Sequence, residues 1–172
     1  MMEIPLFEST KKGGVLSECQ SYRYRLWRIW DEVKPKVMFI MLNPSTADAD
    51  TDDPTIRRCI GFAKSWGFGG LYVGNLFAYR STQPNGLLEP NDAVGIDNNY
   101  HLQEMSKECE IAICAWGNSP ILSKIKPKHE PLKYVSIPLH YIELSKDGTP
   151  KHPLYLKSEL KPVNQTFSKR LI

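Results

Sequence analysis

The run Val37-Met-Phe-Ile-Met-Leu42 is followed directly by the polar triplet Asn43-Pro44-Ser45. A continuous apolar run without polar alternation is typical of a strand that is buried on both faces. The abrupt change at Asn43 predicts that the strand ends there. This stretch therefore predicts a parallel sheet that is covered by helices on both sides.

The segments around this strand alternate between helix and strand signals. Asp53 and Pro54 suit the N-cap and the first turn of a helix, and apolar residues then recur at helical spacing as far as Trp66. We expect further strands at 71–78, 111–116 and about 134–139, and further helices at about 97–108 and after Ser119-Pro120. The order β-α-β-α-β-α-β predicts a three-layer α/β/α sandwich around a central, mostly parallel sheet of four strands.

The segment Tyr22 to Trp30 (YRYRLWRIW) alternates large apolar residues with arginine. This period of two predicts a strand with Tyr22, Tyr24 and Leu26 on one face and Arg23 and Arg25 on the other. We expect it to be an N-terminal edge strand or part of a hairpin, and an amphipathic helix is the alternative.

The composition is that of one globular domain. The chain has 172 residues, of which 41% are apolar and 24% charged, and it contains no repeat or linker, so residues 1–172 are expected to form one domain with a core at about 22–156 and a tail at 157–172. No apolar run approaches the roughly 20 residues of a membrane-spanning helix, and the first residues lack a signal-peptide pattern. We therefore expect a cytoplasmic protein without membrane association.

The cysteines and the charge distribution narrow the chemistry further. Four cysteines, at positions 19, 59, 109 and 114, form no C-x-x-C pair, so we expect no disulfide, zinc site or iron–sulfur cluster. Residues 121–172 carry ten Lys/Arg and four Asp/Glu, a net charge of +6, whereas residues 1–120 carry −3 of the total of +3. This asymmetry permits a face that binds a polyanion without requiring one.

Polar residues follow each predicted strand, where ligands of parallel sheets bind. They are Asn43-Pro44-Ser45, Asn75 to Arg80, Gly117-Asn118, and His140 or His152. Amides with a histidine suit the recognition of the hydrogen-bonding edge of a heterocycle. They do not suit acyl transfer, because the chain has no G-x-S-x-G motif and no convincing pair of nucleophile and base.

Five ordered blocks carry a family resemblance. They are LNPSTAD at 42–48, DPTIRRC at 53–59, NLFAYR at 75–80, AWG at 115–117 and GTPKHPLY at 148–155. Together they resemble a bacterial and phage family, domain of unknown function 1643. More distantly, Met41-Leu42-Asn43-Pro44-Ser45, the Asn75 to Arg80 segment and His152-Pro153 resemble motifs of the uracil-DNA glycosylase superfamily. In that superfamily the last motif continues with Ser-Pro, which Leu154-Tyr155 replaces here.

The superfamily resemblance implies a DNA glycosylase that excises a modified or non-standard base without a cofactor. Asn43 and His152 would be catalytic: Asn43 would orient water, and His152 would donate to the departing base, on which negative charge develops. Asn75 would pair with the edge of an extruded base, since one amide offers a donor and an acceptor. The stacking candidates are Phe77, Tyr79, Trp116 and Tyr155. The candidates for contacts with the DNA backbone are Ser45, Arg80 and Lys151.

Two other functions remain open from the sequence. The first is a non-catalytic module of the same fold that binds a nucleotide, a nucleic acid or a protein partner. The second is a magnesium-dependent phosphohydrolase that uses the carboxylates of Asp48-Ala-Asp50-Thr-Asp52-Asp53. Capping of the following helix by Asp52 or Asp53 is the simpler explanation of that acidic cluster.

Overall fold

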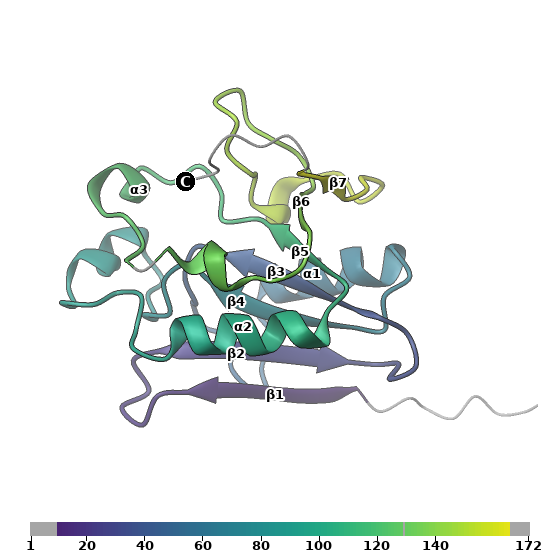
Figure 1. Ribbon diagram of the computed structural model, residues 1–172, viewed down its shortest axis with the longest axis horizontal. Coiled ribbons are helices and arrows are strands. Elements are labelled where there is room, and N and C mark those ends of the chain that lie inside the picture. Colours follow the sequence, from purple (N-terminus) through teal and green to yellow (C-terminus); the bar gives the residue numbers. More distant parts are fainter. Residues whose placement is uncertain (1–9, 129, 166–172) are drawn as a thin grey trace, which may run out of the picture.

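The computed structural model describes residues 10–128 and 130–165, and within them one mixed sheet has seven strands in the order β1-β2-β4-β3-β5-β6-β7 (Figure 1). Strand β3 pairs in parallel with both β4 and β5, and β5 pairs in parallel with β6. The pairs β1–β2, β2–β4 and β6–β7 are antiparallel. The strands are β1 (Lys11–Leu16), β2 (Arg23–Ile29), β3 (Lys36–Met41), β4 (Gly70–Asn75), β5 (Ile111–Cys114), β6 (Leu139–Tyr141) and β7 (Val163–Asn164).

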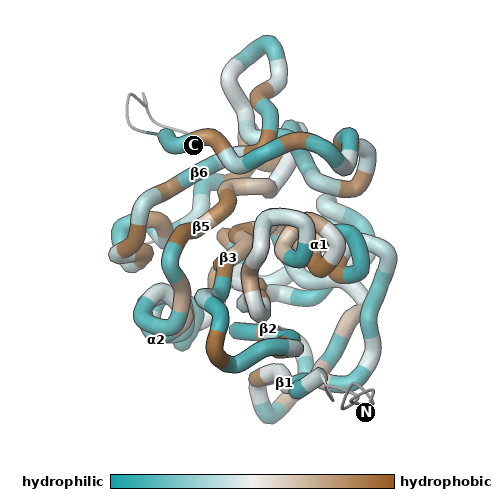
Figure 2. Tube along the Cα trace, turned by 90° about the vertical axis from the view of Figure 1, so that its right-hand side faces the viewer, coloured by the Kyte–Doolittle hydropathy of each residue, from teal (hydrophilic) through white to brown (hydrophobic). Residues whose placement is uncertain are grey.

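The helices lie on both sides of this sheet. The described α-helices are α1 (Pro54–Ser65), α2 (Asn98–Glu108) and the short α3 (Ile121–Lys124), and the 3-10 turns are η1 (Pro84–Leu88), η2 (Pro131–Tyr134) and η3 (Pro153–Tyr155). Figure 2 shows α1 and α2 on opposite sides of β3. The α/β class predicted from the sequence is therefore confirmed.

Strand β3 is covered by a helix on each of its faces. Val37, Phe39 and Met41 enter one apolar cluster together with residues of α1. Met38 and Ile40 enter a second cluster that contains residues of α2. Because successive side chains of a strand point to opposite faces, a continuous apolar run buries both faces at once.

Helix α1 begins where the sequence predicts. The Asp53 side chain accepts the N–H of Ile56 at 2.9 Å, and Pro54 occupies the first helical position. The N-cap fixes the direction in which the chain leaves the loop after β3. As a result, the start of α1 faces the carboxyl end of the sheet.

Strand β2 is confirmed as a strand, but both of its faces are covered. It forms a hairpin with β1 and pairs on its other side with β4, so it lies inside the sheet and not at its edge. Tyr24 and Leu26 are buried, and so are Arg23 and Arg28, at 3% and 0% exposure. The alternation therefore predicted the strand but not the burial of its arginines.

The sheet differs from the prediction in two respects. It has seven strands, whereas the sequence predicted four central strands with an N-terminal edge strand or hairpin. The fourth predicted strand, near 134–139, is displaced, since residues 131–134 form η2 and β6 begins only at Leu139. Pro131 fits the first turn of a 3-10 helix, and Pro138 has no N–H to donate, although its carbonyl accepts the N–H of Ala112 at 3.1 Å.

Two further findings concern the tail and the membrane. Strand β7 lies in the predicted tail, of which residues 166–172 are outside the described part. In residues 10–128 and 130–165, no helix has the length and apolarity required to cross a bilayer. The cytoplasmic location stays a prediction.

Candidate functional site

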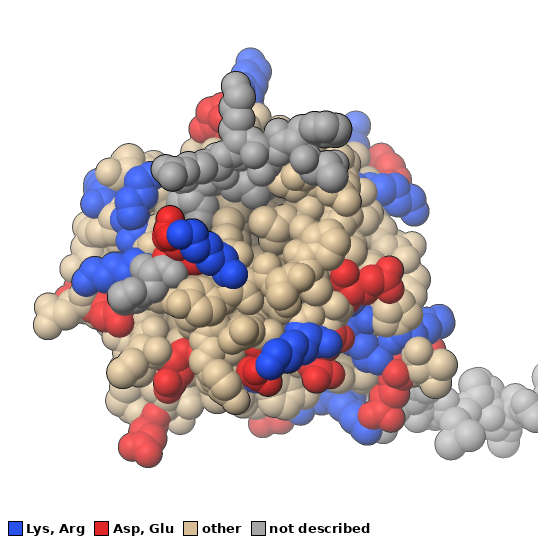
Figure 3. Space-filling view, viewed as in Figure 1, with Lys and Arg blue, Asp and Glu red and all other residues tan. Residues whose placement is uncertain are grey.

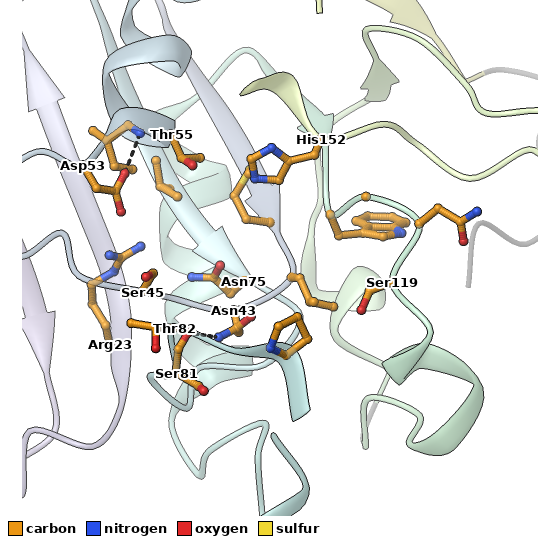
Figure 4. A pocket seen from close by; sticks show the side chains of 18 of the residues that line it. Arg23, Asn43, Ser45, Asp53, Thr55, Asn75, Ser81, Thr82, Ser119 and His152 are labelled. Atoms are coloured by element: carbon orange, nitrogen blue, oxygen red, sulfur yellow. Dashed lines mark hydrogen bonds between the residues drawn. The ribbon is translucent and has the colours of Figure 1, made fainter. Parts of the chain in front are cut away.

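A cavity of about 460 Å³ opens at the carboxyl ends of β3, β4 and β5. Its walls come from six separate parts of the chain: the start of β2, the loop after β3, the end of β4 with the following loop, the segment after β5, the start of α1, and the loop that carries His152. Five of the predicted site residues line it: Asn43, Ser45, Asn75, Trp116 and His152. Figure 4 shows four of them, with Arg23, around this cavity.

Asn75, the last residue of β4, is the most unusual group of the cavity. It is 1% exposed, and neither Nδ2 nor Oδ1 has a hydrogen-bond partner among residues 10–128 and 130–165. The Asn98 amide holds the Asn75 backbone by donating from Nδ2 to its carbonyl at 2.9 Å. A buried polar group is normally satisfied, so this fixed and unpartnered amide is suited to a ligand that offers a donor and an acceptor.

The amide of Asn43 is oriented by backbone carbonyls. Its Nδ2 donates to the carbonyls of Ser81 at 2.9 Å and of Pro44 at 3.1 Å. These bonds tie the loop after β3 to the loop after β4 and occupy the donor side of the amide. The acceptor Oδ1 receives no hydrogen bond from any described residue, so it is available to a water or a ligand hydroxyl.

The neighbours of His152 set its tautomer. Its Nδ1 accepts the N–H of Leu154 at 3.2 Å, so the neutral ring carries its proton on Nε2. Burial lowers the pKa of His152, and the carboxylate of Asp53 opposes that shift. Gly117, at φ +79°, lies so close that a Cβ there would be 3.3 Å from the His152 Cβ. The histidine is thus a neutral donor in a fixed place.

Arg23 also lines the cavity, which the sequence analysis did not anticipate. Its Nη1 donates to the Ala47 carbonyl at 2.8 Å, while its buried Nε has no partner in the part of the chain that the structure describes. Burial lowers the pKa of Arg23 to about 10, and Asp53 opposes that shift, so the side chain is charged at pH 7. Trp116, 2% exposed, also has an unpartnered Nε1.

Five predicted residues lie away from the cavity walls, among them Tyr155, which is 89% exposed at a different hollow. Phe77 is buried with its neighbour Leu76 in one apolar cluster, because the chain leaves the extended conformation after Asn75 and alternation ends. Tyr79 and Arg80 line an adjacent groove of about 370 Å³, which shares Ser45, Ser81 and Thr82 with the cavity. Lys151 pairs with Glu143 at 2.6 Å and lines a different hollow, to which His152 also contributes.

The acidic residues before α1 have structural partners. Asp48 accepts the N–H groups of Asp50 and Thr51, Asp52 pairs with Arg28 at 2.7 Å, and Asp53 caps α1. No group of three or more potential metal ligands occurs among the described residues. Helix capping, one of the two interpretations of this cluster, is confirmed for Asp53.

Comparison with known families gives one match. The family described as "Protein of unknown function (DUF1643)" matches residues 23–154, most of the chain. The chain belongs to the DUF1643 family. The predicted family resemblance is thereby confirmed. No curated protein and no solved structure gives a significant match to this DUF1643 protein.

The charged side chains of the DUF1643 protein do not form one field on the face shown in Figure 3, where basic and acidic groups are interspersed. The polar residues that line its cavity are mostly neutral donors and acceptors, with Arg23 and Asp53 as the charged groups. The sequence gives only a weak signal for Arg23. This arginine stands at the start of a strand with buried apolar residues, where a buried guanidinium needs a specific partner.

Proposed function

We propose that this DUF1643 protein is a DNA glycosylase-like hydrolase that cleaves the N-glycosidic bond of a modified or non-standard base in DNA. The observation that carries the proposal is the buried Asn75 amide, which lacks partners for both Nδ2 and Oδ1 and lines the same cavity as Asn43 and His152. An amide held in this way matches the mixed donor and acceptor edge of a nucleobase.

The other cavity groups fit the remaining parts of the reaction. Departure of the base leaves positive charge on the sugar and negative charge on the base, so preorganised dipoles are required and a covalent nucleophile is not. The free Oδ1 of Asn43 orients a water, which attacks the sugar once its cation is largely formed. The Nε2–H of His152 donates to the base oxygen, on which negative charge develops.

A flipped base requires an aromatic neighbour and a bound strand. Trp116 is the stacking candidate that lines the cavity. The groove lined by Tyr79 and Arg80 adjoins the cavity, because Ser45 lines both. Arg80 and Ser45 are therefore assigned to the DNA backbone, where contacts position a strand without reading its sequence. Lys151 is already paired with Glu143, so it is expected to contribute less than Arg80 to contacts with the DNA backbone.

The likeness to the uracil-DNA glycosylase superfamily belongs to this proposal. Helices on both sides of β3, and motif residues gathered at one end of the sheet, support it. Leu154-Tyr155 in place of Ser-Pro argues against ordinary uracil as the substrate. A modified phage base, and with it a role in antiviral defence in the cytoplasm, is the proposed context by analogy.

The test is release of free base, measured by mass spectrometry. The protein is incubated, with chelator present, with uracil-containing DNA and with genomic DNA from phages that carry modified pyrimidines. Release that is lost in Asn43→Ala and Asn75→Ala, but kept in Asn164→Ala at an exposed strand position, is the expected result. Absence of release from every substrate, with salt-sensitive DNA binding retained, would instead support the non-catalytic binding module.

A further inference from the structure

The guanidinium of Arg23 has one unused edge. Its Nη1 is held by the Ala47 carbonyl at 2.8 Å, but its Nε has no partner and its Nη2 donates to no described residue. Nε and Nη2 form the side of the guanidinium that binds both oxygens of a carboxylate or phosphate. Arg23 is 3% exposed, so the unpaired Nε–H is a costly feature for a purely structural residue.

Arg28, on the same strand, shows how this fold treats a structural arginine. It is 0% exposed, and its Nε donates to the Asp52 carboxylate at 2.7 Å while its Nη2 donates to the Asp48 carbonyl at 2.7 Å. The equivalent edge is therefore filled in Arg28. Arg23 takes part in none of the ion pairs of the described residues. Its free edge is therefore left for a group from outside the chain.

The surroundings of Arg23 favour an anion. Thr55, at the second position of the 12-residue helix α1, lines the same cavity. Pro54 has no N–H, and the N–H groups of Ile56 and Arg57 are accepted by the side chain and the carbonyl of Asp53. The Thr55 N–H is therefore the donor that the start of α1 leaves free for an anion. The hydroxyl of Ser45 adds a further neutral donor to the wall. Asp53 is the opposing charge of the cavity, and its Oδ1 already accepts the N–H of Ile56.

We propose that the Nε/Nη2 edge of Arg23, with the start of α1, binds the phosphate of the nucleotide whose base meets Asn75. The ligand class is thus a nucleotide with its phosphate, not a free base or a nucleoside. A cavity of about 460 Å³ is within the usual range for a small-molecule site, roughly 300–1,000 Å³. The base end of this inference rests on the proposed function, whereas the phosphate end rests on Arg23 alone.

The direct test observes the arginine Nε–H signals by ¹H–¹⁵N NMR. The probes are inorganic phosphate, 2-deoxyribose 5-phosphate, the four deoxynucleosides and their 5′-monophosphates, and a single-stranded oligonucleotide. We expect phosphate-bearing probes to shift the signal that disappears in Arg23→Lys, and each preferred monophosphate to bind about tenfold to hundredfold more tightly than its nucleoside. Shifts by monophosphates would indicate a free nucleotide, and shifts by the oligonucleotide alone would indicate a DNA strand.

Matched variants separate this inference from the proposed function. Arg23→Lys keeps the charge but loses the two-donor edge, so the advantage of the phosphate should fall about tenfold or more, whereas Arg57→Lys, at an exposed position of α1, should leave it unchanged. The inference is overturned if no probe shifts the Arg23 signal in the wild-type protein, a result that does not depend on the folding of any variant. Phosphate binding without base release would refute the proposed glycosylase activity and support the phosphate site at Arg23. Base release at wild-type efficiency by Arg23→Lys would support the glycosylase activity and refute the phosphate site.

Discussion

Replacing Asn75 by leucine is expected to stabilise the ligand-free protein while it removes ligand recognition. The Asn75 side chain is 1% exposed, and both of its polar atoms lack partners. A buried polar group without a hydrogen bond costs about 1–3 kcal/mol in protein mutational series, and leucine is of similar size without that cost. The free energy of unfolding should therefore rise by about 1–3 kcal/mol, and the Tm by about 2–4 °C for each kcal/mol.

The assay is differential scanning calorimetry without ligand, followed by the base-release measurement on the same variant. Asn98→Leu is the matched control, since Asn98 is equally buried but donates to the Asn75 carbonyl at 2.9 Å. We expect no gain in Tm there, because that carbonyl loses its donor. A clear fall in the Tm of Asn75→Leu would refute the reasoning, since it would mean that the amide stabilises the folded chain instead of serving a ligand.

Three further predictions concern the surroundings of the site. Folding lowers the pKa of His152, so the contribution of its neutral ring to stability is complete above about pH 6.5 and is lost as the pH falls through the folded-state pKa. The urea midpoint of the wild type should therefore fall more on acidification than that of His152→Gln. Asp52→Asn should cost about 3 kcal/mol in urea unfolding, since it leaves the fully buried Arg28 without its counter-charge. Gly117→Ala should lower the Tm and weaken ligand binding, because alanine is strained at φ +79° and its Cβ would contact that of His152; an unchanged Tm would contradict that account.

Much of the fold follows from local patterns. The apolar run of β3 predicts burial on both faces, and the Asp53-Pro54 pair predicts the start of α1, because alternation and capping depend on residues close in the chain. The rule that ligands bind at the carboxyl ends of parallel strands then places Asn43, Asn75 and Trp116 in one cavity.

Local patterns were insufficient where distant contacts decide the outcome. The position of β6 depends on its pairing with β5, and apolar residues before Pro138 fit a strand equally well in isolation. The pattern of residues 71–78 predicts one continuous strand, but the strand ends at Asn75 and the side chain of Phe77 packs in the core. In both cases the sequence indicates that the apolar side chains are buried, but not the path that the backbone takes.

By itself, the sequence determined the α/β class, the order of the main elements and the strand ends at which polar residues gather. Only the tertiary structure decided which of those polar groups have partners. The Nδ2 of Asn43 is satisfied by a carbonyl 38 positions away, and the guanidinium of Arg28 by residues 20 and 24 positions away. The side chain of Asn75 and the Nε of Arg23 find no partner in the described part of the chain. Hydrogen bonds between residues distant in the chain depend on three-dimensional packing, and the groups that packing leaves unpaired indicate where a ligand binds.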